Sequence, residues 1–256
     1  MSVVRIGVAG AGGRMGQALL EAGASTQGIA VGSAVDLAPG AWGNVAIGTD
    51  VSAAIAQCDV LIDFTRPAGT LEHVRACVEA RRAIVIGTTG FSPAQAEEIR
   101  RAAAAIPIVM APNMSVGVNV MLKLVELGSR ALGPDYDVEV FEIHHRKKVD
   151  APSGTALKLG EVAAAARGAD LGEVGVFDRH GATGERRPGS MGFSVARGGD
   201  VVGDHTVYFA GTGERIEITH RSSSRATYAQ GAMRAARFLA GKPPGLYDMQ
   251  DVLGLR

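Results

Sequence analysis

The sequence predicts an α/β protein in which an N-terminal doubly wound parallel sheet is followed by a second, sheet-rich α+β domain. Three observations lead to this prediction. Short apolar runs alternate with helical stretches in the first half, a glycine-rich turn follows the first apolar run, and strand-like runs dominate later in the chain. The length of 256 residues favours two domains over one large domain, because a typical domain has about 100–150 residues.

The first half of the chain alternates strand and helix. Short apolar runs predict buried strands over residues 3–9, 29–35, 59–64, 83–86 and 106–110. Helices are expected between them over residues 14–24 and 68–80, and from Pro93 after a potential N-cap at Ser92. Strands separated by helices imply parallel pairing with right-handed crossovers. In such a sheet, ligands bind at the carboxyl ends of the strands.

The pattern changes after Pro112. Ser115 can cap a long helix over residues 116–132, and later helices are expected over residues 155–166 and 226–239. Strand-like runs occupy residues 138–143, 192–196, 206–209 and 215–219. We therefore expect one domain built from residues 1–114 and 225–256, and a second domain built from residues 115–224, with the C-terminal helix packing back on the first domain.

Composition excludes several classes of protein. Lys plus Arg and Asp plus Glu both total 26, so no net charge attracts nucleic acid or an anionic membrane. The N-terminus lacks the features of a signal peptide, and no apolar run approaches the roughly 20 residues that cross a bilayer. Cys58 and Cys77 are too few for a disulfide framework and lack metal-ligand spacing. These features predict a cytoplasmic protein.

The glycine-rich turn predicts a Rossmann-like dinucleotide site. Gly10, Gly13 and Gly16 lie between the first strand and the first helix. A tight turn there lets backbone amides approach a pyrophosphate, and the helix N-terminus adds partial positive charge. Small residues also ease helix–sheet packing, so the turn alone is weak evidence. Its position between strand and helix makes Arg14 and Met15 further candidates for cofactor contact.

Asp36 ends the second strand, 20 residues after Gly16 (36 − 16), where a carboxylate can bind the adenosine ribose. Its charge favours NAD over NADP, whereas Arg14 could accept the additional phosphate of NADP. The alternatives are a surface turn aspartate and a solvated cation. We expect use of both NADH and NADPH, with NADH preferred. A second loop, formed by Gly87, Thr88, Thr89 and Gly90, is either a plain turn or a nicotinamide contact at a strand end.

A basic segment follows the strand that ends at Ile143. His144 and His145 precede Arg146, Lys147 and Lys148, which concentrates cationic donors in a neutral protein. The alternative is a solvated basic loop with an ordinary helix cap. A metal site is less expected, because adjacent histidines project differently and no carboxylate is placed with recognisable spacing.

The helix that follows this segment predicts an anion site. Ser153, Gly154 and Thr155 fall at its start, where amides and hydroxyls have no partner within the helix. Lys148 could neutralise a second carboxylate, and a histidine is the natural proton donor near neutral pH. The expected ligand is a small dicarboxylate that accepts a proton during the reaction.

Together these motifs resemble the dihydrodipicolinate reductase family over nearly the whole chain. The matching segments are 8–16, 63–65, 87–91, 111–113, 142–156, 197–200, 203–206, 217–220 and 245–254. The segment from Glu142 to Ala156 is the most specific of them.

The resemblance implies NAD(P)H-dependent reduction of 4-hydroxy-tetrahydrodipicolinate, in its dehydrated form, to tetrahydrodipicolinate in lysine and diaminopimelate biosynthesis. It places the catalytic acid on His144 and its companion on Lys148. It implies a homotetramer assembled through the sheets of the second domain, and closure around the substrate. The substrate carboxylates fall on His145, Lys148, Ser153, Gly154 and Thr155. A further cofactor contact falls on Asn113, and Arg225 falls near the cofactor or the hinge.

One departure bears on the cofactor. The stretch 37–50 is short for the family, and Leu37 stands where some members carry an arginine. The additional phosphate of NADP therefore has fewer binding partners in this chain. Two other functions remain open: a related reductase of another small carboxylate, and a non-catalytic NAD(P) sensor. A sensor would have no need for His144 and Lys148.

Overall fold

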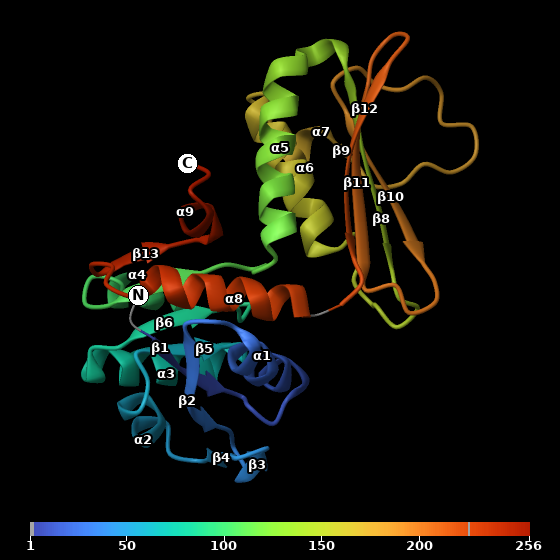
Figure 1. The fold of residues 1–256 in the computed structure, drawn as a ribbon. Coiled ribbons are helices and arrows are strands. Elements are labelled where there is room, and N and C mark those ends of the chain that lie inside the picture. The colour runs from blue at the N-terminus through green and yellow to red at the C-terminus, as the bar shows by residue number, and fades with distance from the viewer. Residues whose placement is uncertain (1–2, 225) are drawn as a thin grey trace. The chain divides into compact units, whose positions relative to one another are not determined.

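The computed structural model describes residues 3–224 and 226–256, and the chain divides into two compact units (Figure 1). The first consists of Met1–Val116 with Arg225–Arg256, and the second of Gly117–Ser224. The chain therefore leaves the first unit once and returns to it for the C-terminal segment.

The first unit contains an eight-stranded sheet in the order β13-β7-β6-β5-β1-β2-β4-β3. All neighbouring strands in it are parallel except β3 and β4. The strands are β1 Val4–Ala9, β2 Ile29–Val35, β3 Gly40–Trp42, β4 Val45–Gly48, β5 Val60–Asp63, β6 Ala83–Ile86, β7 Pro107–Met110 and β13 Gly245–Tyr247. The helices are α1 Arg14–Ser25, α2 Val51–Ala56, α3 Pro67–Ala80, α4 Pro93–Ala102, α8 Ala226–Leu239 and α9 Met249–Leu253.

The central strands are buried on both faces, which explains their continuous apolar runs. Ile6, Ile62 and Val85 are at most 1% exposed. Helix α8 shares a core with α1, in which Leu20 packs in the same cluster as Ala232. The C-terminal segment is thus part of the core of the first unit.

Local sequence signals explain several boundaries in this unit. Ser92 and Gln95 form a reciprocal capping box at the start of α4, where Pro93 takes the first helical position. The short hairpin β3–β4, helix α2, strand β13 and helix α9 were not predicted. Helix α2 has only six residues and is capped by Asp50, whose carboxylate accepts from the Ala53 amide. Elements this short carry too few residues to display a period.

The strand order creates a switch point beside β1. The chain passes from β1 to β2 on one side of the sheet and later enters β5 on the other side of β1. The loops after β1 and β5 therefore diverge and leave a crevice at the carboxyl ends of these strands. The predicted doubly wound sheet is confirmed, and its glycine-rich turn lies at this crevice.

The second unit is a five-stranded mixed sheet, in the order β12-β11-β8-β10-β9. Strand β8 runs parallel to β10 and antiparallel to β11. The strands are β8 Asp137–His144, β9 Gly175–Val176, β10 Met191–Arg197, β11 Gly203–Ala210 and β12 Arg215–Ser222. The helices are α5 Val116–Leu132, the 3-10 turn η1 Gly133–Asp135, α6 Gly154–Ala166 and α7 Leu171–Val174.

Strand β8 alternates between a covered and an open face. Val138 and Val140 are buried in a core with Leu159 of α6 and Val125 of α5. Because side chains alternate along a strand, the next residues on this covered face are polar. The polar end of β8 therefore projects toward the start of α6.

Candidate active site

The glycine loop after β1 accepts no side chain at its key positions. Gly10 has a φ of 72°, a conformation that L side chains rarely adopt. A Cβ on Gly16 would lie 2.1 Å from the carbonyl oxygen of Gly10, and one on Gly13 would lie 3.3 Å from it. The start of α1 is thus pressed against the end of β1, and its first amides lack partners within the helix. This cradle fits a pyrophosphate.

Asp36 lies against this loop. Its carboxylate accepts from the Gly12 amide at 2.8 Å and from the Leu37 amide at 2.7 Å. The structure therefore brings Asp36 to the glycine turn, as the spacing suggested. Arg14 is exposed, and the side chain of Leu37 is 99% exposed. Met15 is half-buried and packs against the core.

The loop after β6 differs from the expectation in one respect. Thr88 is buried, and its hydroxyl accepts from Thr70 at 2.9 Å and donates to Asp63 at 3.3 Å. This hydroxyl is therefore turned into the protein, whereas Thr89 and Gly90 are exposed. The Gly87 amide donates to the carbonyl of Asp63.

Two cofactor candidates remain, Asn113 and Arg225. Asn113 accepts from the Ser115 amide at 2.9 Å and so shapes the turn before α5. Arg225 lies outside the described residues.

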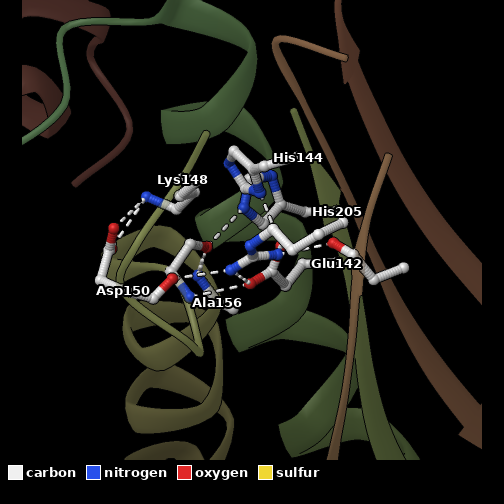
Figure 2. Close-up of polar contacts among 9 residues, drawn as sticks. Glu142, His144, Lys148, Asp150, Ala156 and His205 are labelled. Carbon is white, nitrogen blue, oxygen red and sulfur yellow. Dashed lines mark hydrogen bonds and ion pairs between the residues drawn. The ribbon is translucent and has the colours of Figure 1, made fainter. Parts of the chain in front are cut away.

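A second cluster gathers at the polar end of β8, and its centre is Glu142 (Figure 2). This carboxylate is 1% exposed. It accepts from Nδ1 of His144 at 2.6 Å, from both terminal nitrogens of Arg197 at 2.8 and 2.9 Å, and from the Ser153 amide at 3.0 Å. One buried anion thus holds a histidine, an arginine and the start of α6 together.

Electrostatics keep Glu142 ionised. Burial acts to raise its pKa, but hydrogen bonds from Arg197, His144 and the Ser153 amide outweigh burial, and the pKa lies below its usual value. An ionised carboxylate only accepts, so Nδ1 of His144 carries a proton. Nε2 of His144 is then the nitrogen left for chemistry. It lies against Gly203, where a Cβ would come within 2.8 Å of it.

His205 completes the cluster from β11. Its Nε2 lies 2.9 Å from the Ser153 hydroxyl, and its ring meets that of His144 edge-on, with centroids 5.1 Å apart. Burial, reinforced by the neighbouring His144, lowers the pKa of His205 to about 4. His205 is therefore neutral at physiological pH. Ser153 also caps α6, because its hydroxyl accepts from the Ala156 amide.

Lys148 lies in the loop between β8 and α6. Its ammonium contacts both carboxylate oxygens of Asp150 at 2.8 Å. Arg197 donates to the carbonyl of Asp150 at 2.7 Å, which ties this loop to the Glu142 cluster. His145 is half-buried, and within the described chain its Nδ1 has no hydrogen-bond partner.

The structure thus brings together His144, Ser153 and the residues at the start of α6, with Lys148 in the adjoining loop. Sequence reasoning assigned no role to Glu142, Arg197 or His205. A signal existed for the first: Glu142 and His144 are two residues apart on a strand and must share a face. Among the described residues, no group of three His, Cys, Asp or Glu side chains could hold a metal ion.

Comparisons with known proteins identify the family of the chain. Residues 4–114 match the family model "Dihydrodipicolinate reductase, N-terminus", and residues 117–253 match "Dihydrodipicolinate reductase, C-terminus". The chain belongs to the dihydrodipicolinate reductase family. The resemblance found in the sequence is therefore confirmed.

Members of the family are similar over their full lengths. The 4-hydroxy-tetrahydrodipicolinate reductase of Bordetella pertussis is 58% identical over 266 residues, covering 98% of this chain and 97% of that protein. The protein of the same name from Nitrosospira multiformis is 56% identical and is matched over 100% of both chains.

A solved structure shares the fold. The dipicolinate-bound dihydrodipicolinate reductase from Paenisporosarcina sp. TG-14 superposes with a TM-score of 0.81 at 24% identity, covering 98% of this chain and 99% of that one. Within the residues that the structure describes, no helix is long and apolar enough to span a membrane.

Proposed function

We propose that this chain reduces 4-hydroxy-tetrahydrodipicolinate, through dihydrodipicolinate, to tetrahydrodipicolinate, with His144 as the proton donor. The reductase activity, in lysine and diaminopimelate biosynthesis, follows from family membership. The observation that supports the role of His144 is its hydrogen bond to the buried Glu142 carboxylate. A cytoplasmic enzyme is expected.

The residues of the second unit supply the proton and bind the substrate. Nε2 of His144 donates the proton, while Nδ1–H stays bonded to Glu142 before and after transfer. The ammonium of Lys148 stabilises the negative charge that develops on the substrate. Ser153, Gly154, Thr155 and His145 bind the substrate carboxylates at the start of α6.

The first unit fits a dinucleotide. Gly10, Gly13 and Gly16 let the turn pack closely, because Cβ atoms there would contact Thr65 or the Gly10 carbonyl, and the backbone amides of such a turn can approach a pyrophosphate. We assign further cofactor contacts to Arg14, Met15, Asp36, Gly87, Thr89, Asn113 and Arg225, and to the backbone of Thr88, whose hydroxyl is turned into the protein. Bound NAD(P)H supplies the two electrons and the hydrogen that the substrate ring accepts. Asp36 favours NADH, because a carboxylate repels the additional phosphate of NADPH.

We further propose a homotetramer formed through the open face of the second sheet. Phe141, Ile143 and Tyr208 lie on the face opposite α6, because they alternate with the covered residues of β8 and β11. All three are only half-buried in the single chain. An apolar face of this kind is suited to pairing with a second copy.

The decisive experiment follows the loss of NADH absorbance in purified protein. Addition of the product of the preceding condensation enzyme should start the oxidation, and NADPH should support a lower rate. His144→Gln should reduce turnover by about 10²- to 10⁴-fold, the usual contribution of general acid catalysis, with little change in NADH affinity. His180→Gln, at an exposed histidine, is the matched control.

Two outcomes would contradict the proposal. Binding of NADH without oxidation in the presence of that product would favour another carboxylate substrate or a sensing role. An equal loss of turnover and NADH affinity in His144→Gln would remove His144 as the acid.

A further inference from the structure

Three strand ends meet at the switch point of the first unit. Asp63, the last residue of β5, is the sheet neighbour of Ala9 at the end of β1 and of Ile86 at the end of β6. The glycine loop follows β1 and the Gly87–Gly90 loop follows β6. The side chain of Asp63 is 0% exposed, and the mechanism above makes no use of it.

The Asp63 carboxylate connects three chain segments. Its Oδ1 accepts from the amide and the hydroxyl of Thr65, both at 2.7 Å, and from the Thr88 hydroxyl at 3.3 Å. Its Oδ2 lies 2.7 Å from Nδ1 of His73 on α3. Thr70, also on α3, donates to Thr88 at 2.9 Å.

These partners keep the carboxylate ionised. Burial acts to raise the pKa of Asp63, but the hydrogen bond and charge of His73 and the two bonds from Thr65 outweigh it, so the pKa is lowered. A buried anion with this many donors fixes their positions closely, because leaving any of them unpaired is costly.

Both cofactor loops pack on the two residues that follow Asp63. A Cβ on Gly87 would lie 2.1 Å from the ring of Phe64, and a Cβ on Gly10 would lie 2.9 Å from Cγ2 of Thr65. The position of the Gly87–Gly90 loop relative to the glycine loop therefore depends on the Phe64–Thr65 turn. The Asp63 carboxylate holds this turn, because it accepts hydrogen bonds from the amide and the hydroxyl of Thr65.

We propose that Asp63, paired with His73, is a positioning residue that sets the Gly87–Gly90 loop relative to the glycine loop and so fixes the nicotinamide half of the cofactor. This inference rests on the proposed function, in which residues of the Gly87–Gly90 loop contact the cofactor, and it takes this contact to be with the nicotinamide, one of the two alternatives that the sequence predicts. Asp63 does not contact the cofactor, because it is fully buried. It acts through the hydroxyls of Thr65 and Thr88.

If the Asp63–His73 pair only stabilised the fold, its loss would weaken binding equally in every part of the nucleotide site. NADH and ADP-ribose distinguish the two roles, because ADP-ribose contains the adenosine and pyrophosphate groups but lacks nicotinamide. The two ligands are compared by calorimetric titration without substrate. The variants are Asp63→Asn, which removes the charge at constant shape, and Thr70→Val, which removes a buried hydroxyl. Ser33→Ala is the matched control, because Ser33 lies on β2 and its buried hydroxyl donates to the Ala54 carbonyl of α2, away from the two loops.

Asp63→Asn should weaken NADH binding about tenfold, or about 1.4 kcal/mol, and change ADP-ribose binding less than about twofold. Thr70→Val should weaken NADH binding by a smaller factor. If Asp63→Asn does not fold, the comparison of NADH and ADP-ribose binding in Thr70→Val tests the inference instead. Ser33→Ala should leave the ratio of the two dissociation constants unchanged.

Equal weakening of both ligands, or no change in either, would overturn the inference. This outcome is separate from failure of the proposed function, which would appear as absent NADH oxidation with substrate in the wild-type enzyme.

Discussion

Nδ1 of His144 lies 2.6 Å from Oε2 of Glu142, two residues earlier on the same strand. The alternation of β8 places both side chains on the covered face, and Arg197 with the Ser153 amide fills the remaining acceptor sites of the carboxylate. Glu142 is therefore fixed from three sides, and it fixes the ring of His144 and the tautomer in which Nδ1 carries the proton.

This pairing predicts the effect of Glu142→Gln. A glutamine side chain can donate a hydrogen bond as well as accept one, so it no longer requires a proton on Nδ1 of His144. The ring of His144 then loses the contact that fixes its orientation and the position of its proton. We expect turnover to fall by about 10²-fold, at the lower end of the contribution of acid catalysis, with unchanged NADH affinity. Steady-state rates and NADH titration measure the two effects.

Glu139→Gln supplies the control on the same strand. Glu139 is paired with Arg179 and Arg186 on the other face of β8. Its replacement should leave turnover unchanged. A fall of equal size in both variants would mean that turnover reports general charge loss rather than the contact with His144.

The ion pair of Lys148 with Asp150 predicts competition with the substrate. A carboxylate of the substrate can bind Lys148 only if the ammonium leaves or shares Asp150. The side chain of Asp150 is 56% exposed, and such pairs are worth at most about 1 kcal/mol. Asp150→Asn should therefore lower the KM for substrate by up to about fivefold, whereas Lys148→Met should raise it. Initial rates at varied substrate concentration give both values, and a higher KM in Asp150→Asn would show that Asp150 instead orients Lys148 for binding.

The sequence was most informative where neighbours along the chain determine the structure. Two such features are the strand–turn–helix unit around Gly10–Gly16 and the Ser153 cap of α6. Each depends on residues within a few positions of one another, and the structure contains both. The orientation of Thr88 could not be predicted, because its partners Asp63 and Thr70 come from other elements of the fold.

The full surroundings of His144 depend on more distant segments. Arg197 reaches Glu142 across 55 positions, and His205 reaches Ser153 across 52. Only the pairing of β8 with β10 and β11 brings them together. The alternation of β8 predicts that Glu142 shares a face with His144. Its burial could not be predicted, because no local sequence signal separates a buried glutamate from an exposed one.

The exposure of Leu37 predicts how cofactor preference can be changed. Leu37 follows Asp36 directly, and at 99% exposure it makes little contact that a substitution could disturb. Leu37→Arg should raise kcat/KM with NADPH by about tenfold, because a hydrogen bond to a charged group contributes about 1.5–3 kcal/mol before solvent screening. Leu37→Met is the neutral control. The prediction fails if the ratio of NADPH to NADH activity is the same in both variants.

The neutral state of His205 predicts a loss of stability in acid. The pKa of His205 is about 4 in the folded protein, against an ordinary value of 6.5. Between these values the unfolded chain binds a proton that the folded protein excludes, so the free energy of unfolding falls as pH decreases from 6.5 toward 4. At about 1.4 kcal/mol per pKa unit, the loss reaches about 3 kcal/mol at the acid end.

His205→Gln tests this directly, because glutamine can keep a hydrogen bond to Ser153 but does not titrate. Denaturant unfolding at pH 7 and at pH values down to 4 should show a smaller loss of stability in the variant than in the wild type. His180→Gln, at an exposed position, should behave as the wild type. If His205→Gln loses as much stability on acidification as the wild type, the folded protein binds a proton at His205 as readily as the unfolded chain does. The neutral state of His205 would then not be the cause of the loss of stability in acid.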